Sequence, residues 1–200
     1  MTDYLWWEEL DATAPLLQGD IVEACPNAVF NPEPPFNPAD PVALLQDLRG
    51  RVGVQQVRAI VMTQACDLAE HKVQNAILCP AYTLDDFRTE WNAKRQAEGK
   101  EPSQGAFDGY VGSIRTGRIW NLTMLRKREA GTDVQVTAST SIVDFHEVFS
   151  LPVAFLELWL AAAGQRRLRL APPYREHLSQ AFARYFMRVG LPVDIDPANL

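Results

Sequence analysis

The chain has 200 residues, of which 47% are hydrophobic and 22% charged, and its formal net charge is −6. These values are typical of a globular protein and exclude a disordered chain, a collagen-like repeat and a coiled-coil rod. The acidic balance argues against general nucleic-acid binding, which depends on basic surfaces that neutralise phosphates. No apolar run approaches the ~20 residues of a membrane span, and the acidic start lacks the basic residues of a signal peptide. We therefore expect a cytoplasmic protein with no membrane contact.

The first part of the chain is expected to form a strand, a long loop and a short helix. Residues 19–25 begin at a glycine turn and predict a short strand, whereas residues 26–41 contain six prolines and predict an extended surface loop. Asp40 has the character of an N-cap with Pro41 in the first turn, so a short helix is expected over residues 41–48.

Two apolar segments then predict a pair of buried strands, over residues 57–63 and 76–79. The short, polar connection between them indicates an antiparallel pair. Thr83 and Asp86 have the spacing of a capping box, which predicts a helix that begins there and fades near Gly99.

The second half combines strands with two final helices. In chain order we expect a glycine-containing loop at 99–118, a hairpin of 119–125 with 133–138, a strand at 141–149, a helix at 153–163, a basic strand at 165–170 and a helix at 174–189. Because strands dominate the middle of the chain, this order indicates the α+β class.

Three segments in order carry a family resemblance: Gly-Asp-Ile-Val at 19–22, the apolar run at 55–62 that contains Arg58, and the strand ending Pro-Ala-Tyr-Thr at 80–83. Together they resemble the start of the PemK/MazF-like toxins. The resemblance implies a small SH3-like antiparallel β-barrel over residues 1–150, enlarged by the loop and helix, with residues 151–200 as a helical extension packed on it. Ala59 stands where the toxins have proline, and Thr83 falls one position late.

The resemblance also implies catalytic roles for Arg58 and Thr83, since such toxins cut single-stranded RNA without a metal. An arginine there would stabilise the charge that develops on the phosphorus centre. The alternative is that Arg58 lies at a strand edge and Thr83 caps a helix.

A second candidate cluster is formed by Cys66 and Asp67 with His71, in the connection between the two apolar strands. The stretch around Cys66 is also similar to one in a group of uncharacterised bacterial proteins. A nearby imidazole would favour the thiolate, the nucleophilic form of a cysteine. The alternative is a small buried cysteine beside a turn that Asp67 stabilises. Strand pairing would keep Cys66 and Cys79 too far apart for a shared zinc ion, so no metal or other cofactor is expected.

Charged and aromatic residues offer weaker candidates. Asp144 and His146 would share a face of the strand expected at 141–149. Arginines at the end of the chain could line a ligand or partner groove, and several tryptophans are candidates for a contact surface. These are Arg175, Arg184 and Arg188, and Trp6, Trp7, Trp91 and Trp120.

The preferred hypothesis is a non-enzymatic interaction or regulatory module with a PemK/MazF-like fold and a protein partner, in a bacterial toxin–antitoxin or phage-defence system. One alternative is a metal-independent endoribonuclease acting on single-stranded RNA through Arg58 and Thr83. The other is a thiol-dependent enzyme that uses Cys66.

Overall fold

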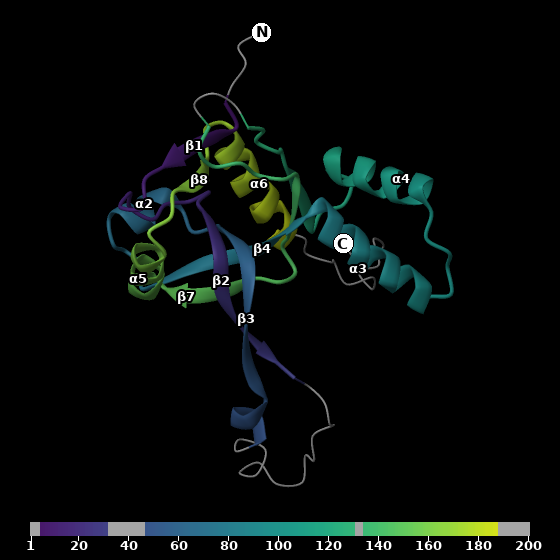
Figure 1. Cartoon of the computed structure of the whole chain (residues 1–200), viewed down its shortest axis with the longest axis horizontal. Helices are drawn as coiled ribbons and strands as arrows, with labels where there is room; N and C mark the ends of the chain where they lie inside the picture. The colour runs from purple at the N-terminus through teal and green to yellow at the C-terminus, as the bar shows by residue number, and fades with distance from the viewer. Residues whose placement is uncertain (1–4, 32–46, 131–133, 188–200) are drawn as a thin grey trace, which may run out of the picture.

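The computed structural model describes residues 5–31, 47–130 and 134–187. In this part of the chain, two antiparallel sheets and a set of helices confirm the α+β class (Figure 1). One sheet pairs β1 with β8, and the other has the order β2-β3-β4-β6-β5, with β7 also paired to β4. The strands are β1 Trp7–Leu10, β2 Ile21–Phe30, β3 Val52–Val61, β4 Asn75–Thr83, β5 Leu122–Leu125, β6 Ser141–Asp144, β7 Phe149–Pro152 and β8 Arg167–Leu170. The helices are α2 Ala65–Ala69, α3 Leu84–Ala97, α4 Gln104–Arg115, α5 Val153–Ala163 and α6 Tyr174–Phe186.

β2 and β3 form a long antiparallel ribbon whose far end projects from the body of the molecule (Figure 1). Residues 26–30 lie in β2, so the prediction of a loop from residue 26 was wrong at its start. A proline is tolerated in β2 because it is the terminal strand of its sheet, in which only some of the N–H groups face the neighbouring strand. The rest of the predicted loop, and the predicted helix up to residue 46, lie outside the described residues; residues 47–51 are helical.

The predicted antiparallel pair is confirmed as β3 and β4. Ile60 lies opposite Cys79 and Val61 opposite Leu78, and all four side chains are fully buried. The short helix α2 occupies the connection that was expected to be a turn. This pair is the centre of the fold, because both of the larger apolar clusters draw on it.

The strand expected over 141–149 is two strands, β6 and β7, that pair with successive parts of β4. The chain leaves the sheet between them, and Phe145 turns into the core against Phe182, with ring centroids 5.4 Å apart. Asp144 and His146 therefore do not share a strand, which corrects that prediction.

The expected partner of residues 119–125 was also wrong. β5 pairs with β6, and residues 134–138 contribute a single bridge from Ala138 to Arg128. The connection from β5 to β6 is thus a long excursion, and β5 becomes the terminal strand at the end of the sheet opposite β2.

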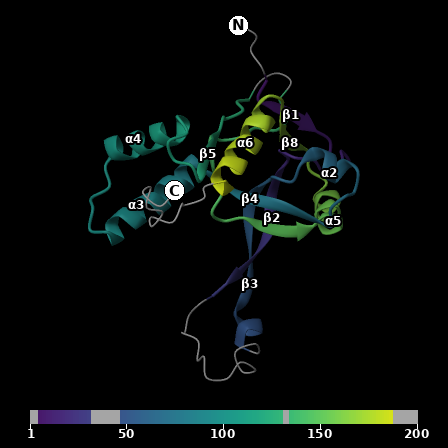
Figure 2. The ribbon, with the colours of Figure 1, turned by 180° about the vertical axis from the view of Figure 1, so that it is seen from behind.

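The helix expected after Thr83 is confirmed as α3, but the loop expected at 99–118 contains a second helix, α4. Ser103 caps α4 by accepting a hydrogen bond from the Ala106 amide, 3.3 Å away. The apolar face of α4 packs on α3, and there the rings of Phe107 and Trp91 lie edge to face with centroids 5.3 Å apart. The two helices project together from the side of the sheet (Figure 2). Aromatic packing thus outweighs the low helix propensity of the glycines in α4.

The C-terminal elements follow the prediction closely. α5 ends at Gly164, which adopts the left-handed conformation with φ 60°. β8 is fully buried because it pairs with β1, and α6 packs Leu178 and Phe182 against the main core. Residues from the predicted extension at 151–200 therefore share one core with residues from the N-terminal part.

Neither sheet closes into a barrel within the described residues, so the expected SH3-like barrel is not confirmed. The three segments that carry the family resemblance do form neighbouring antiparallel strands, β2, β3 and β4. Across the described ranges, no helix combines the length and apolar character needed to cross a bilayer.

Candidate functional site

Arg58 and Thr83, for which the toxin resemblance implies catalytic roles, both lie beside the same serine, Ser141. Arg58 Nη1 donates to Ser141 Oγ at 3.0 Å, and Ser141 lies directly opposite Thr83 in the pairing of β4 with β6. Arg58 Nε lies 2.9 Å from a carboxylate oxygen of Glu23, and the arginine side chain is only 15% exposed. The guanidinium is thus already held at two positions by partners within the fold.

Thr83 caps helix α3, as the alternative interpretation of this residue predicted. Its Oγ1 accepts from the Asp86 amide at 3.1 Å and donates to Asp86 Oδ2 at 2.6 Å. Both capacities of the hydroxyl are therefore used in the helix cap.

Cys66 lies exposed in the short helix α2. Its sulfur is 3.7 Å from an oxygen of Gln64 and 3.7 Å from Asp67 Oδ1. The alternative of a buried cysteine is therefore wrong. Within the described residues the thiol makes no hydrogen bond to His71, which adopts a left-handed conformation with φ 52°. The three residues share one connection, but the contacts of the thiol are to oxygen acceptors rather than to an imidazole.

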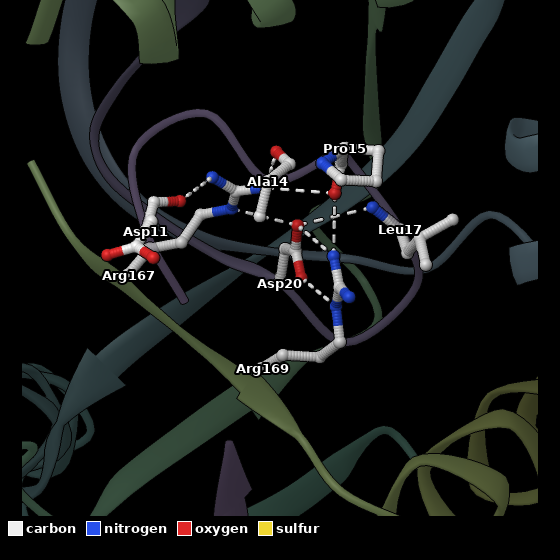
Figure 3. A network of polar contacts seen from close by, with 7 residues as sticks. All are labelled: Asp11, Ala14, Pro15, Leu17, Asp20, Arg167 and Arg169. Atoms are coloured by element: carbon white, nitrogen blue, oxygen red, sulfur yellow. Dashed lines mark hydrogen bonds and ion pairs between the residues drawn. The ribbon is translucent and has the colours of Figure 1, made fainter. Parts of the chain in front are cut away.

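A buried ionic network, which the sequence did not predict, ties the N-terminal segment to β8 (Figure 3). Asp20 is fully buried and pairs with Arg167 Nε at 3.0 Å and Arg169 Nη2 at 3.1 Å. The two guanidinium groups also donate to the carbonyl oxygens of Asp11, Ala14 and Pro15. Because these buried groups satisfy one another, we assign the network a structural role.

A second polar cluster surrounds Tyr82. The Tyr82 hydroxyl donates to Glu147, and burial first, then this bond and neighbouring carboxylates, raise the pKa of the phenol. Burial and the charges of Glu147, Asp86 and Asp144 raise the pKa of Glu90 as well. Among the residues that the structure describes, no group of three or more acidic, histidine or cysteine side chains is arranged to hold a metal ion.

A concave pocket of about 420 Å³, lined in part by two tryptophans, lies between α4, β5, α6 and the N-terminal segment. We call it the arginine-lined pocket. Its lining residues are Trp6, Ile114, Arg115, Gly117, Ile119, Trp120, Leu122, Thr123, Met124, Arg126, Thr140, Ala181 and Arg184. A volume of this order suits a small organic molecule.

Two tryptophans give the pocket flat apolar surfaces. Trp6 stacks on Tyr174 with ring centroids 3.8 Å apart, which fixes the indole on the body of the protein. Trp120 is 44% exposed, and the guanidinium carbon of Arg184 lies 5.0 Å from the centre of its ring. Aromatic rings that line a pocket are surfaces on which planar ligands stack.

The charge of the pocket is opposite to that of the chain. Arg115, Arg126 and Arg184 line it, and none of the described residues that line it carries a carboxylate. Within the described ranges none of the three forms an ion pair. The hydrogen bond and charge of Lys127 and, to a smaller extent, the charge of Arg126 lower the pKa of Glu129, which does not line the pocket. The pocket therefore offers three cations on an apolar aromatic surface.

No protein-family model, curated protein or solved structure matches this chain. The site therefore rests on the geometry of the chain itself.

The sequence indicated parts of this pocket separately. Trp6 and Trp120 were candidates for a contact surface, and Arg184 was a candidate for lining a groove. Of the other two arginines of that groove, Arg175 pairs with Glu176 at 2.9 Å and Arg188 lies outside the described residues. The position of Arg115 in the pocket was not predicted, because it depends on α4, a helix that was not expected in a glycine-containing segment.

Proposed function

We propose that this protein is a non-enzymatic interaction and regulatory module that binds an organic anion in the arginine-lined pocket. The observation that carries the proposal is the combination of Arg115, Arg126 and Arg184 with an aromatic lining that contains no carboxylate. Guanidinium groups bind carboxylates, sulfonates and phosphates through paired, charge-assisted hydrogen bonds. The indole rings favour a ligand with a planar apolar part.

The chemistry of the lining supports binding rather than turnover. Besides the arginines, the polar side chains of the pocket are the indoles and the hydroxyls of Thr123 and Thr140. A hydroxyl needs an adjacent base to act as a nucleophile, and the described residues of the lining include no histidine, carboxylate, lysine or cysteine. The set is therefore suited to recognition.

The resemblance of residues 19–83 to PemK/MazF-like toxins supports placing the module on an SH3-like fold, in a toxin–antitoxin or phage-defence system. A protein partner is part of this proposal. The helix α5 supports it, because Leu158 is 72% exposed and Phe155 39% exposed on a helix that carries a single charged residue, Glu157.

The test is a fluorescence titration with anilinonaphthalene sulfonate, a planar aromatic anion, at fixed ionic strength. The double variant Arg115→Gln/Arg126→Gln should bind the probe at least about tenfold more weakly than the wild type, since each lost charge-assisted bond weakens the complex. Arg118→Gln is the matched control, because Arg118 is exposed nearby and does not line the pocket. Equal affinities for the wild type and the double variant would reject the proposal.

A second candidate function, metal-independent cleavage of single-stranded RNA, is supported by one observation: Arg58 and Thr83 both lie at Ser141. The test is incubation of the purified protein with a long single-stranded RNA, with and without EDTA. Cleavage in EDTA that is lost in Arg58→Ala would establish this function, and intact RNA would remove it.

A further inference from the structure

We propose, building on the function above, that the anion held in the arginine-lined pocket is a free nucleoside phosphate. Such a ligand joins a flat heteroaromatic base to a phosphate group. The pocket presents surfaces for both parts side by side, from segments that are far apart in the chain.

The tryptophans supply the surface for the base. Tyr174 covers one face of the Trp6 ring and does not line the pocket, so the pocket meets Trp6 at its other face or its edge. Trp120 forms a second aromatic surface, with Arg184 stacked over its ring. Stacking on such rings tolerates every base, because every base has a π face.

The arginines supply the surface for the phosphate. Arg115 lies in the last turn of α4 and Arg126 directly follows β5, so two separate elements bring guanidinium groups to the pocket. Planar guanidinium forks match the oxygens of a phosphate, which accepts several hydrogen bonds at once. A third cation, Arg184, links the two surfaces because it contacts Trp120 and also lines the pocket.

Polar groups for the sugar and the base edges come from β5 and Thr140. Among the described strands β5 is terminal in its sheet, and a strand in that position has backbone groups on the side away from its neighbour. Leu122, Thr123 and Met124 of this strand line the pocket, as does the Thr140 hydroxyl. An aliphatic acid would leave these polar groups and the aromatic rings unused, whereas a nucleotide has a complement for each.

The size of the pocket favours a free nucleotide over a long strand. A pocket of about 420 Å³ accommodates one small molecule, and the chain as a whole carries a net charge of −6, which repels an extended polyanion. Three cations line this one concave site.

The test is isothermal titration calorimetry of the full chain with adenosine, guanosine, cytidine and uridine monophosphates. The matching nucleosides, inorganic phosphate and a short single-stranded RNA serve as comparison ligands. We expect at least one monophosphate to bind, with its nucleoside and inorganic phosphate each at least about tenfold weaker, because each has only one of the two recognised parts.

Two variants and two controls assign the binding to the pocket. Trp120→Leu and Arg126→Gln should each weaken nucleotide binding by about tenfold, through lost stacking and a lost charge-assisted bond. Trp120→Phe keeps a flat ring and should retain most of the affinity, and Arg118→Gln should match the wild type. Circular dichroism and thermal melting serve as the controls for the folding of each variant.

The remaining outcomes separate this inference from the proposed function. If the aromatic sulfonate binds through the arginines and no nucleotide does, the inference is wrong and the proposed function stands. If neither binds, both are wrong. If the RNA strand binds and no monophosphate does, the free nucleotide is rejected as the ligand.

Discussion

The guanidinium carbon of Arg184 lies 5.0 Å from the centre of the Trp120 ring. This contact joins the C-terminal helix α6 to the segment that precedes β5, and both residues line the arginine-lined pocket. A cation over an indole is attracted by the negative face of the ring, by about 0.5–1 kcal/mol at an exposed site. The contact between Arg184 and Trp120 thus stabilises the wall of the pocket, and the guanidinium of Arg184 is also one of the groups proposed to bind the ligand.

A double-mutant cycle should detect this pair. The coupling between Arg184→Ala and Trp120→Leu in the free energy of unfolding should be about 0.5–1 kcal/mol, measured by urea denaturation. As a control, Arg184→Ala combined with Trp91→Leu should be additive, because Trp91 packs between α3 and α4 on other rings. A coupling of zero for Arg184 and Trp120 would show that the contact contributes nothing in solution.

Asp20→Asn should destabilise the protein severely. The substitution keeps the shape of the side chain but leaves Arg167 and Arg169 buried without their carboxylate, at a cost of about 3–5 kcal/mol. Chemical denaturation measures the loss. The exposed Asp108→Asn should change stability by less than about 0.5 kcal/mol. Similar stabilities for the two variants would contradict the assigned structural role of the network.

The cap of α3 should be measurable at Thr83. Thr83→Ala removes the acceptor for the Asp86 amide and should lower the free energy of unfolding by about 1 kcal/mol, whereas Thr83→Ser should keep most of it. Thr89→Ala is the control, since the Thr89 hydroxyl bonds only to a carbonyl one turn earlier and alanine favours a helix. A larger loss at Thr89 than at Thr83 would contradict the capping role.

Alkaline pH should destabilise the fold through two buried thiols. Burial raises the pKa of Cys25 from 9.0 to about 12, and burial with the charge of Asp144 raises the pKa of Cys79 to about 12. Between pH 9.0 and about 12 these thiols are deprotonated in the unfolded chain and protonated in the folded protein. The free energy of unfolding therefore falls as the pH rises through this range. Denaturation across this range should give a shallower slope for Cys25→Ala/Cys79→Ala than for the wild type. An unchanged slope would show that the thiols do not titrate differently on folding.

The native protein should react with a thiol reagent at one cysteine. Cys66 is exposed, while Cys25 in β2 and Cys79 in β4 are fully buried. Mass spectrometry after brief labelling should find a single adduct on Cys66, and labelling in denaturant should find all three. Equal labelling of Cys79 in the native state would contradict its burial.

The elements that local sequence predicted well have strong local causes. α3 has its cap at Thr83, α5 ends at a left-handed Gly164, and α6 has an apolar stripe that contacts the core. β3 and β4 were predictable because both are apolar runs with a short connection, which leaves few ways to pair.

The elements that were missed depend on packing between distant residues. α4 contains three glycines, and its helical state depends on contacts such as that of Phe107 with Trp91. The division of residues 141–149 into β6 and β7 depends on Phe145 entering a core that includes Phe182. Neither partner is near in sequence, so local patterns could not reveal them.

The candidate site was only partly predictable for the same reason. Trp6, Trp120 and Arg184 could be selected as residue types with binding chemistry, but their convergence is set by the packing of the N-terminal segment, β5 and α6. The buried network around Asp20 likewise joins residues 147 positions apart, a separation that no sequence spacing encodes.

The most direct test of the proposed binding module is a crystal structure of the chain with bound anilinonaphthalene sulfonate. We expect the aromatic part of the probe to lie against Trp6 or Trp120, and its sulfonate to lie within hydrogen-bonding distance of Arg115, Arg126 or Arg184. A probe bound on the exposed apolar surface of α5, with the arginine-lined pocket empty, would contradict it.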